Sequence, residues 1–151
     1  MLQPIIINLT QYSNDFRLRT TEQTSQIWCP IRLRWIQLTP EELVRQSVIQ
    51  FLLQKRGINR GRIGVEKGIK VNGMLKRFDV LVMAPSGKPQ MLIECKSFDI
   101  SITQALFDQL SSYNQALQAP WIWATNGHIS YVCKISPEGE YDFVTKEFPT
   151  I

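Results

Sequence analysis

The stretch RFDVLVMAPSGKPQMLIECK, Arg77–Lys96, decides the fold of this 151-residue chain. It holds two apolar runs, Arg77–Met83 and Gln90–Cys95, on either side of a turn that contains proline and glycine. Runs of this length around such a turn predict two antiparallel strands. A two-residue loop at Ser86–Gly87 would fix the register of the hairpin.

Charged residues interrupt both predicted strands. In that register Leu81 faces Leu92 and Asp79 faces Glu94, with Cβ atoms about 5 Å apart. Lys96 lies two residues beyond Glu94 and shares its face. Two carboxylates at this distance repel each other, and a hard divalent cation such as Mg²⁺ or Mn²⁺ would remove the repulsion. The cluster fits a metal-dependent phosphodiester hydrolysis site and, equally well, an ordinary surface network of Asp, Glu and Lys.

A helix should precede the hairpin. Thr39 is a typical N-cap, Pro40 suits the first helical position, and Glu42 occupies the capping-box position. We expect the helix to run to about Gln54. Glu42 could serve the cap, an acidic site or both.

The remaining elements complete an α/β (α+β) sandwich. One strand ends at an Asn72-Gly73 turn, and a second helix should separate the hairpin from the last strands. Tight turns make the first three strands antiparallel, and the second helix can cross over one face of a mixed sheet. The expected ranges are strands 63–71, 121–124, 129–135 and 141–144 and a helix over 103–117.

The chain is long enough for one domain, 1–151. Residues 39–151 form the predicted core, and 1–38 an N-terminal β extension. The β-prone pieces of this extension are Ile5–Leu9, Phe16–Arg19, Ile27–Cys29 and Trp35–Leu38.

Composition narrows the class of protein. The chain is 44% hydrophobic, which supports a core, and it contains no apolar run long enough to span a membrane. Three cysteines without CxxC spacing argue against a disulfide framework or a zinc site and favour the cytoplasm. We expect Trp121, Trp123 and Cys95 to be core residues, and His128 to be exposed.

Positive charge is concentrated in the first part of the chain. The net charge is +4, but residues 1–84 carry +7 and residues 85–151 carry −3. Clustered cations attract phosphate backbones, although a solvated basic face has the same composition. The candidate nucleic-acid-binding residues are Lys55, Arg56, Arg60, Arg62, Lys67, Lys70, Lys76 and Arg77.

Asp79 followed by Glu94-Cys95-Lys96 resembles the signature of the PD-(D/E)XK nuclease superfamily. More of the chain agrees, and the set resembles small proteins related to the N-terminal nuclease domain of type I restriction enzyme R subunits. The matching segments lie between about Pro40 and Ile135: Pro40–Gln46, Val65–Lys67, Lys76–Asp79, Ile93–Lys96, Phe107–Asn114 and Thr125–Gly127.

The resemblance implies a restriction-endonuclease-like fold, with a mixed sheet flanked by helices, and a role for each matching residue. Asp79, Glu94 and the main-chain carbonyl of Cys95 would hold Mg²⁺ or Mn²⁺, and Lys96 would position water or stabilise phosphate charge. Glu42 would be the acidic residue of the first helix. Gln109 and Tyr113 match a Gln-x-x-x-Tyr motif. The role of Glu66 stays open, and a salt bridge is the simpler interpretation.

The implied function is metal-dependent hydrolysis of DNA. A homodimer would supply the two sites that cutting both strands requires, and an ATP-driven motor does not fit into 151 residues. Two alternatives remain: a nucleic-acid-binding or assembly module that keeps the fold without turnover, and a structural charge network.

Overall fold

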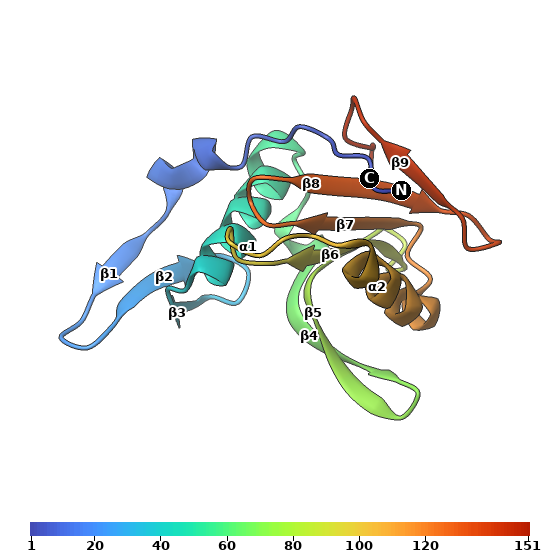
Figure 1. Ribbon diagram of the computed structural model, residues 1–151. Helices are drawn as coiled ribbons and strands as arrows, with labels where there is room; N and C mark the ends of the chain where they lie inside the picture. The colour runs from blue at the N-terminus through green and yellow to red at the C-terminus, as the bar shows by residue number, and fades with distance from the viewer.

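A six-stranded mixed sheet forms the centre of the molecule (Figure 1). The computed structural model describes all 151 residues. β6 and β7 are parallel, and every other neighbouring pair is antiparallel. The strands follow chain order across the sheet: β4 (Ile63–Val71), β5 (Met74–Met83), β6 (Pro89–Cys95), β7 (Trp121–Thr125), β8 (Ser130–Ile135) and β9 (Tyr141–Val144).

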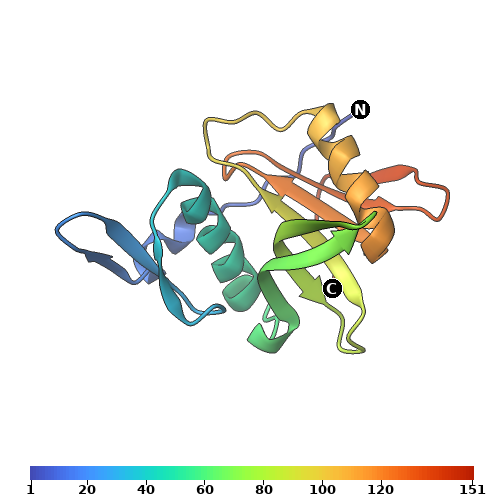
Figure 2. The ribbon, with the colours of Figure 1, turned by 90° about the horizontal axis from the view of Figure 1, so that it is seen from below.

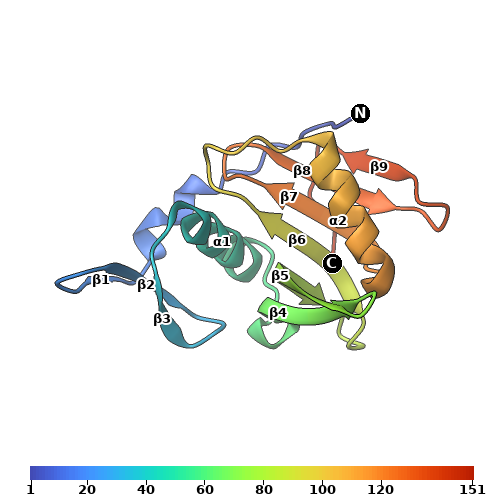
Figure 3. The same ribbon diagram turned by 60° about the horizontal axis from the view of Figure 1, so that its bottom comes forward.

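Two helices pack on opposite faces of this sheet (Figure 3). α1 (Pro40–Gln50) continues into a π-helical turn, Phe51–Lys55, and α2 (Gln104–Leu117) makes the crossover between β6 and β7. Ile93 packs with the α1 residues and Leu92 with the α2 residues, as strand alternation requires. The predicted α/β sandwich is therefore confirmed. Neither helix combines the length and apolar character needed to cross a membrane.

N-capping threonines begin both helices, as the sequence predicts. Thr39 accepts a hydrogen bond from the main-chain N–H of Glu42, and Thr103 accepts one from Leu106, both at 3.1 Å. Each cap satisfies a donor that the first helical turn leaves free.

The predicted register of the β5–β6 hairpin is confirmed in its interior, but the predicted loop is wrong. Leu81 pairs with Leu92, whereas Met83 pairs with Pro89 and not with Gln90. Ala84 donates a main-chain hydrogen bond to the Lys88 carbonyl beyond the strand ends, which leaves a loop of three residues, Pro85–Gly87, with Gly87 at φ 86°. Three-residue hairpin loops commonly place glycine in this conformation and adjoin a bulge. An irregularity between Val82 and Met83 then restores the expected pairing.

The alternation of β5 breaks at Asp79. Phe78 packs in the α2-side core and Val80 in the α1-side core, although residues two apart in a regular strand share a face. The β4–β5 ladder is interrupted at the same level, where Glu66 has φ 51°. Beyond this point the β4–β5 hairpin curls out of the sheet (Figure 1).

The residues before α1 form a separate three-stranded antiparallel sheet (Figure 2). Its strands are β1 (Leu18–Thr20), β2 (Ser25–Cys29) and β3 (Arg34–Gln37), close to three of the predicted pieces. The fourth piece, Ile5–Leu9, is not a strand: Ile5 makes a single bridge to Ser130, and a 3₁₀ helix, Thr10–Asp15, follows.

Candidate active site

Asp79 is held at the bend of β5 by two hydrogen bonds. Its Oδ1 accepts a hydrogen bond from Arg45 Nη2 at 2.8 Å, and its Oδ2 accepts one from the main-chain N–H of Cys95 at 2.7 Å. The β5–β6 ladder ends at the Val80–Ile93 pair, one residue before the expected Asp79–Glu94 pair. Asp79 therefore spans from α1 to the end of β6 and does not form a regular cross-strand pair.

Glu94 and Lys96 form an ion pair at the end of β6, with 3.3 Å between Lys96 Nζ and Glu94 Oε1. The Glu94 side chain is 20% exposed. Burial and then the negative charge of Asp79 raise the pKa of Glu94, Lys96 opposes both effects, and the resulting pKa is about 7. Partial burial is the largest single effect on Lys96 and disfavours its charged form. The charge and hydrogen bond of Glu94, together with the charges of Glu41 and Asp79, outweigh burial, so the pKa of Lys96 is raised.

Behind Asp79 lies a buried ion network. Arg45, 6% exposed, pairs with Asp79 and Glu42, and its Nη2 lies 3.6 Å from Glu66 Oε1. Arg32, from the turn between β2 and β3, pairs with both Glu42 and Glu66. Burial disfavours the charged form of Arg45, yet its hydrogen bond and charge interaction with Asp79 raise its pKa, so it remains a cation.

Glu42 has the partners of this network and not those of a capping box. Thr39 caps the helix, but the Glu42 carboxylate accepts hydrogen bonds from Arg32, Arg45 and Gln46. A divalent cation at Glu42 would meet two buried guanidinium groups. Its suggested role as a metal ligand stays a prediction that these contacts disfavour.

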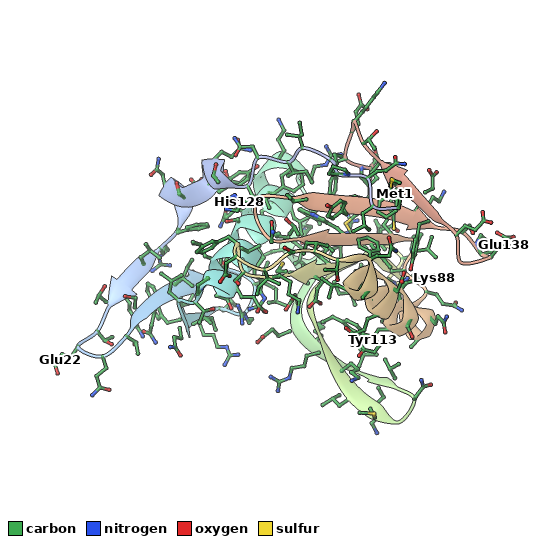
Figure 4. The ribbon with its side chains drawn as sticks, viewed as in Figure 1. Met1, Glu22, Lys88, Tyr113, His128 and Glu138 are labelled. Carbon is green, nitrogen blue, oxygen red and sulfur yellow. The ribbon has the colours of Figure 1, made fainter.

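Gln109 and Tyr113 lie on α2, which packs on the sheet face opposite α1. Gln109 donates a hydrogen bond to the Tyr113 hydroxyl at 2.9 Å. The Tyr113 ring lies 6.5 Å from that of Phe78, and the Lys76 ammonium lies 5.1 Å from its centroid. Figure 4 labels Tyr113 on the side of α2 toward the β4–β5 hairpin. The motif thus lies beside the strand that carries Asp79.

The structure separates the predicted basic residues into two groups. Four of them follow α1: Lys55, Arg56, Arg60 and Arg62. Two of these guanidinium groups are engaged by main-chain oxygens, Arg56 by Pro149 and Arg62 by Met83. The other four lie on the β4–β5 hairpin: Lys67, Lys70, Lys76 and Arg77.

The predictions for neighbouring residues agree with the structure. Trp123 and Cys95 are fully buried, Trp121 is half-buried and His128 is exposed. Burial raises the pKa of the Cys95 thiol, which is therefore no nucleophile. All three cysteines are free.

The sequence predicts two carboxylates, Asp79 and Glu94, as the side-chain ligands of a metal. No group of three or more His, Cys, Asp or Glu side chains is arranged to hold an ion. Mg²⁺ is commonly bound by one or two carboxylates, with waters and substrate phosphates completing its shell. Asp79, Glu94 and the Cys95 carbonyl stay the predicted members of such a partial set, and both oxygens of Asp79 already accept hydrogen bonds.

Sequence reasoning missed Arg32 and Arg45. Arg45 has a weak signal, because it is a cation beside the apolar positions of the first helix and three residues after Glu42. Arg32 has no such signal in the sequence, because its partners, Glu42 and Glu66, lie on α1 and β4.

Comparison with known proteins identifies the family of this chain. The model of the type I restriction enzyme R protein N terminus matches residues 40–149. The chain belongs to this family. Comparison with curated proteins gives no match.

One solved structure supports the fold of this chain. It is a fragment assigned to an HsdR subunit of a type I restriction enzyme from Vibrio vulnificus YJ016, with a TM-score of 0.51 and 21% identity. The match covers 75% of this chain and 24% of that one, so the chain spans about a quarter of the solved fragment. The restriction-endonuclease-like fold is thereby confirmed.

Replacing Arg45 by methionine should destabilise the protein by about 3–5 kcal/mol, because Asp79 and Glu42 would lose their buried counter-ion. Urea unfolding measures the loss. Arg60→Met removes an exposed arginine and should change stability by no more than about 0.5 kcal/mol. Equal stability of the two variants would contradict a structural role for the network.

Glu94→Gln should change how stability depends on pH in EDTA. The folded protein keeps the Glu94 proton up to about pH 7, whereas the unfolded chain releases it near 4.5. Wild-type stability therefore falls as pH rises through this window, and the variant should avoid a loss of about 2–3 kcal/mol by pH 8. Thermal unfolding from pH 4 to 8 tests this, with the exposed Glu138→Gln as control. Parallel profiles for Glu94→Gln and wild type would refute the raised pKa.

Proposed function

We propose that the chain is a Mg²⁺- or Mn²⁺-dependent nuclease that hydrolyses DNA phosphodiester bonds. One observation carries the proposal: Glu94 is buried near the charge of Asp79, and Lys96 is its only ion-pair partner. A carboxylate in this position costs stability near neutral pH. Membership of a restriction enzyme family supports the same conclusion.

Asp79 and Glu94, with the Cys95 carbonyl, would hold the cation from two strands. When bound, it would stabilise negative charge that develops on the scissile phosphate. Arg45 and the Cys95 N–H keep Asp79 oriented before any cation arrives. Such preorganisation reduces the reordering that binding requires.

Lys96 has the position to act on water and phosphate. Its ammonium lies beside Glu94, and the Lys96 side chain is 32% exposed, so a substrate can reach it. The raised pKa keeps it protonated, which suits charge compensation and orientation of the attacking water better than proton abstraction. Gln109 and Tyr113 would contact the DNA backbone from the opposite face. Two copies acting on one duplex would cut both strands.

A second candidate is a nucleic-acid-binding module without turnover. Both oxygens of Asp79 already accept hydrogen bonds, one of them from a permanently charged arginine. If Arg45 neutralises Asp79 in place of a metal, DNA would be bound but not cut. Assays on linear, nicked, branched and single-stranded DNA, with Mg²⁺, Mn²⁺ or EDTA, separate the two functions.

Mg²⁺ or Mn²⁺ should raise the melting temperature, because a ligand that binds only the folded state stabilises it. Asp79→Asn should lose most of this metal-dependent increase. Asp142→Asn changes an exposed aspartate on β9 and should retain it. Equal metal-dependent shifts in all three proteins would place the ion elsewhere.

Lys96→Ala should reduce the rate of metal-dependent DNA cleavage by at least about 10²-fold, since an orienting or proton-transferring group typically contributes 10²–10⁴. Folding and DNA binding should be retained. Lys88→Ala removes an exposed lysine from the β5–β6 turn and should cut at the wild-type rate. Wild-type cleavage by Lys96→Ala would make this lysine structural and refute the mechanism.

A further inference from the structure

The N-terminal three-stranded sheet has one buried and one open face. Ile27 and Cys29 are fully buried, and Trp28 between them points the other way and is half-buried. Trp28 pairs with Trp35 across the ladder, their ring centroids 5.6 Å apart. This outward face is therefore defined by Trp28, Trp35, Gln26, Gln37, Arg17 and Arg19.

The guanidinium groups of two arginines lie over these indoles. The guanidinium carbon of Arg17 is 5.1 Å from the Trp28 centroid and 5.6 Å from that of Trp35, and that of Arg19 is 4.4 Å from Trp35. Arg19 Nε also donates a hydrogen bond to Gln26 at 2.6 Å. Stacking of this kind fixes a guanidinium while leaving most of its N–H donors free.

The positive charge of the outward face is uncompensated. Every salt bridge in the protein involves Arg32, Arg45 or Lys96, and none involves Arg17 or Arg19. The acidic residue of this sheet is Glu22, which Figure 4 shows at the tip of the β1–β2 turn. A cation–π contact at an exposed site contributes only about 0.5–1 kcal/mol, so stability gives little reason to place two half-buried tryptophans on the outward face.

The sheet is tied firmly to the candidate active site. Arg32, in its β2–β3 turn, bonds Glu42 and Glu66, and these belong to the network that orients Asp79. The salt bridges of Arg32 thus connect the sheet that carries the outward face to the residues that orient Asp79.

We propose that the outward face binds the phosphate backbone of duplex DNA beside the cleavage site, with Arg17 and Arg19 as the phosphate contacts and Trp28 and Trp35 as their supports. The family match begins at residue 40, so this surface lies outside it. The inference rests on the proposed function for the position of the DNA. Binding itself does not require cleavage and can be measured in EDTA.

The experiment is fluorescence anisotropy of a labelled 20-base-pair duplex titrated with the full chain in EDTA, from 50 to 200 mM KCl. Arg17→Gln/Arg19→Gln should reduce the slope of log affinity against log salt by about 1.8, because each duplex phosphate contact contributes about 0.9. Arg17→Lys/Arg19→Lys should keep the slope but weaken binding severalfold, since lysine lacks the planar group that stacks on indole.

The matched control is Lys88→Gln/Lys146→Gln, which removes two exposed charges elsewhere; Figure 4 shows Lys88 far from Glu22. It should leave the slope unchanged. The proposal is overturned if the wild-type chain does not bind the duplex, if the arginine variant keeps the wild-type slope, or if the control lowers the slope equally. Binding that depends on Arg17 and Arg19 with single-stranded DNA or RNA, but not with the duplex, would also overturn it.

Cleavage assays with Mg²⁺ keep the two proposals apart. A chain that shows duplex binding dependent on Arg17 and Arg19 but never cuts supports this inference and refutes the proposed nuclease. A chain that cuts with Mg²⁺ but binds the duplex independently of both arginines supports the proposed nuclease and refutes this inference.

Discussion

The contact between Arg45 and Asp79 is the interaction on which the rest of the site depends. It joins α1 to the bend of β5. Further ion pairs of the same network connect these elements to β4 through Glu66 and to the N-terminal sheet through Arg32. A buried arginine needs counter-ions because desolvation of an unpaired charge is costly. The same requirement keeps the Asp79 carboxylate in a fixed orientation at the end of β6, next to Glu94.

A break in strand regularity makes this contact geometrically feasible. In an unbroken strand, the side chain of Asp79 would share the face of Leu81, which packs under α2. The change of face between Phe78 and Val80 brings the carboxylate toward Arg45 on α1. Glu66 adopts φ 51° at the same level, a conformation that is costly for a residue with a side chain and that surrounding structure must enforce. The strain and the candidate site occur together.

The N-terminal sheet is a part of the site as well as an addition to the fold. Its inner face contributes Cys29 to the α1-side core, and its β2–β3 turn contributes Arg32 to the buried network. The family model matches residues 40–149, so the network combines residues of the matched region with an arginine from outside it. The orientation of Asp79 is thereby coupled to an element that the family match does not include.

The sequence by itself determined the order of the helices and strands, both N-caps and the interior register of the β5–β6 hairpin, because these follow from local patterns of apolar residues, turns and caps. It also brought Asp79, Glu94 and Lys96 to one end of this hairpin. The predicted loop was one residue too short, and a bulge next to the loop restored the register. Only the tertiary structure decided the partners of these charges. Arg45 meets Asp79 and Arg32 meets Glu66, each across 34 residues of sequence. Such pairs depend on how helix, sheet and extension dock together, and no local pattern encodes that arrangement.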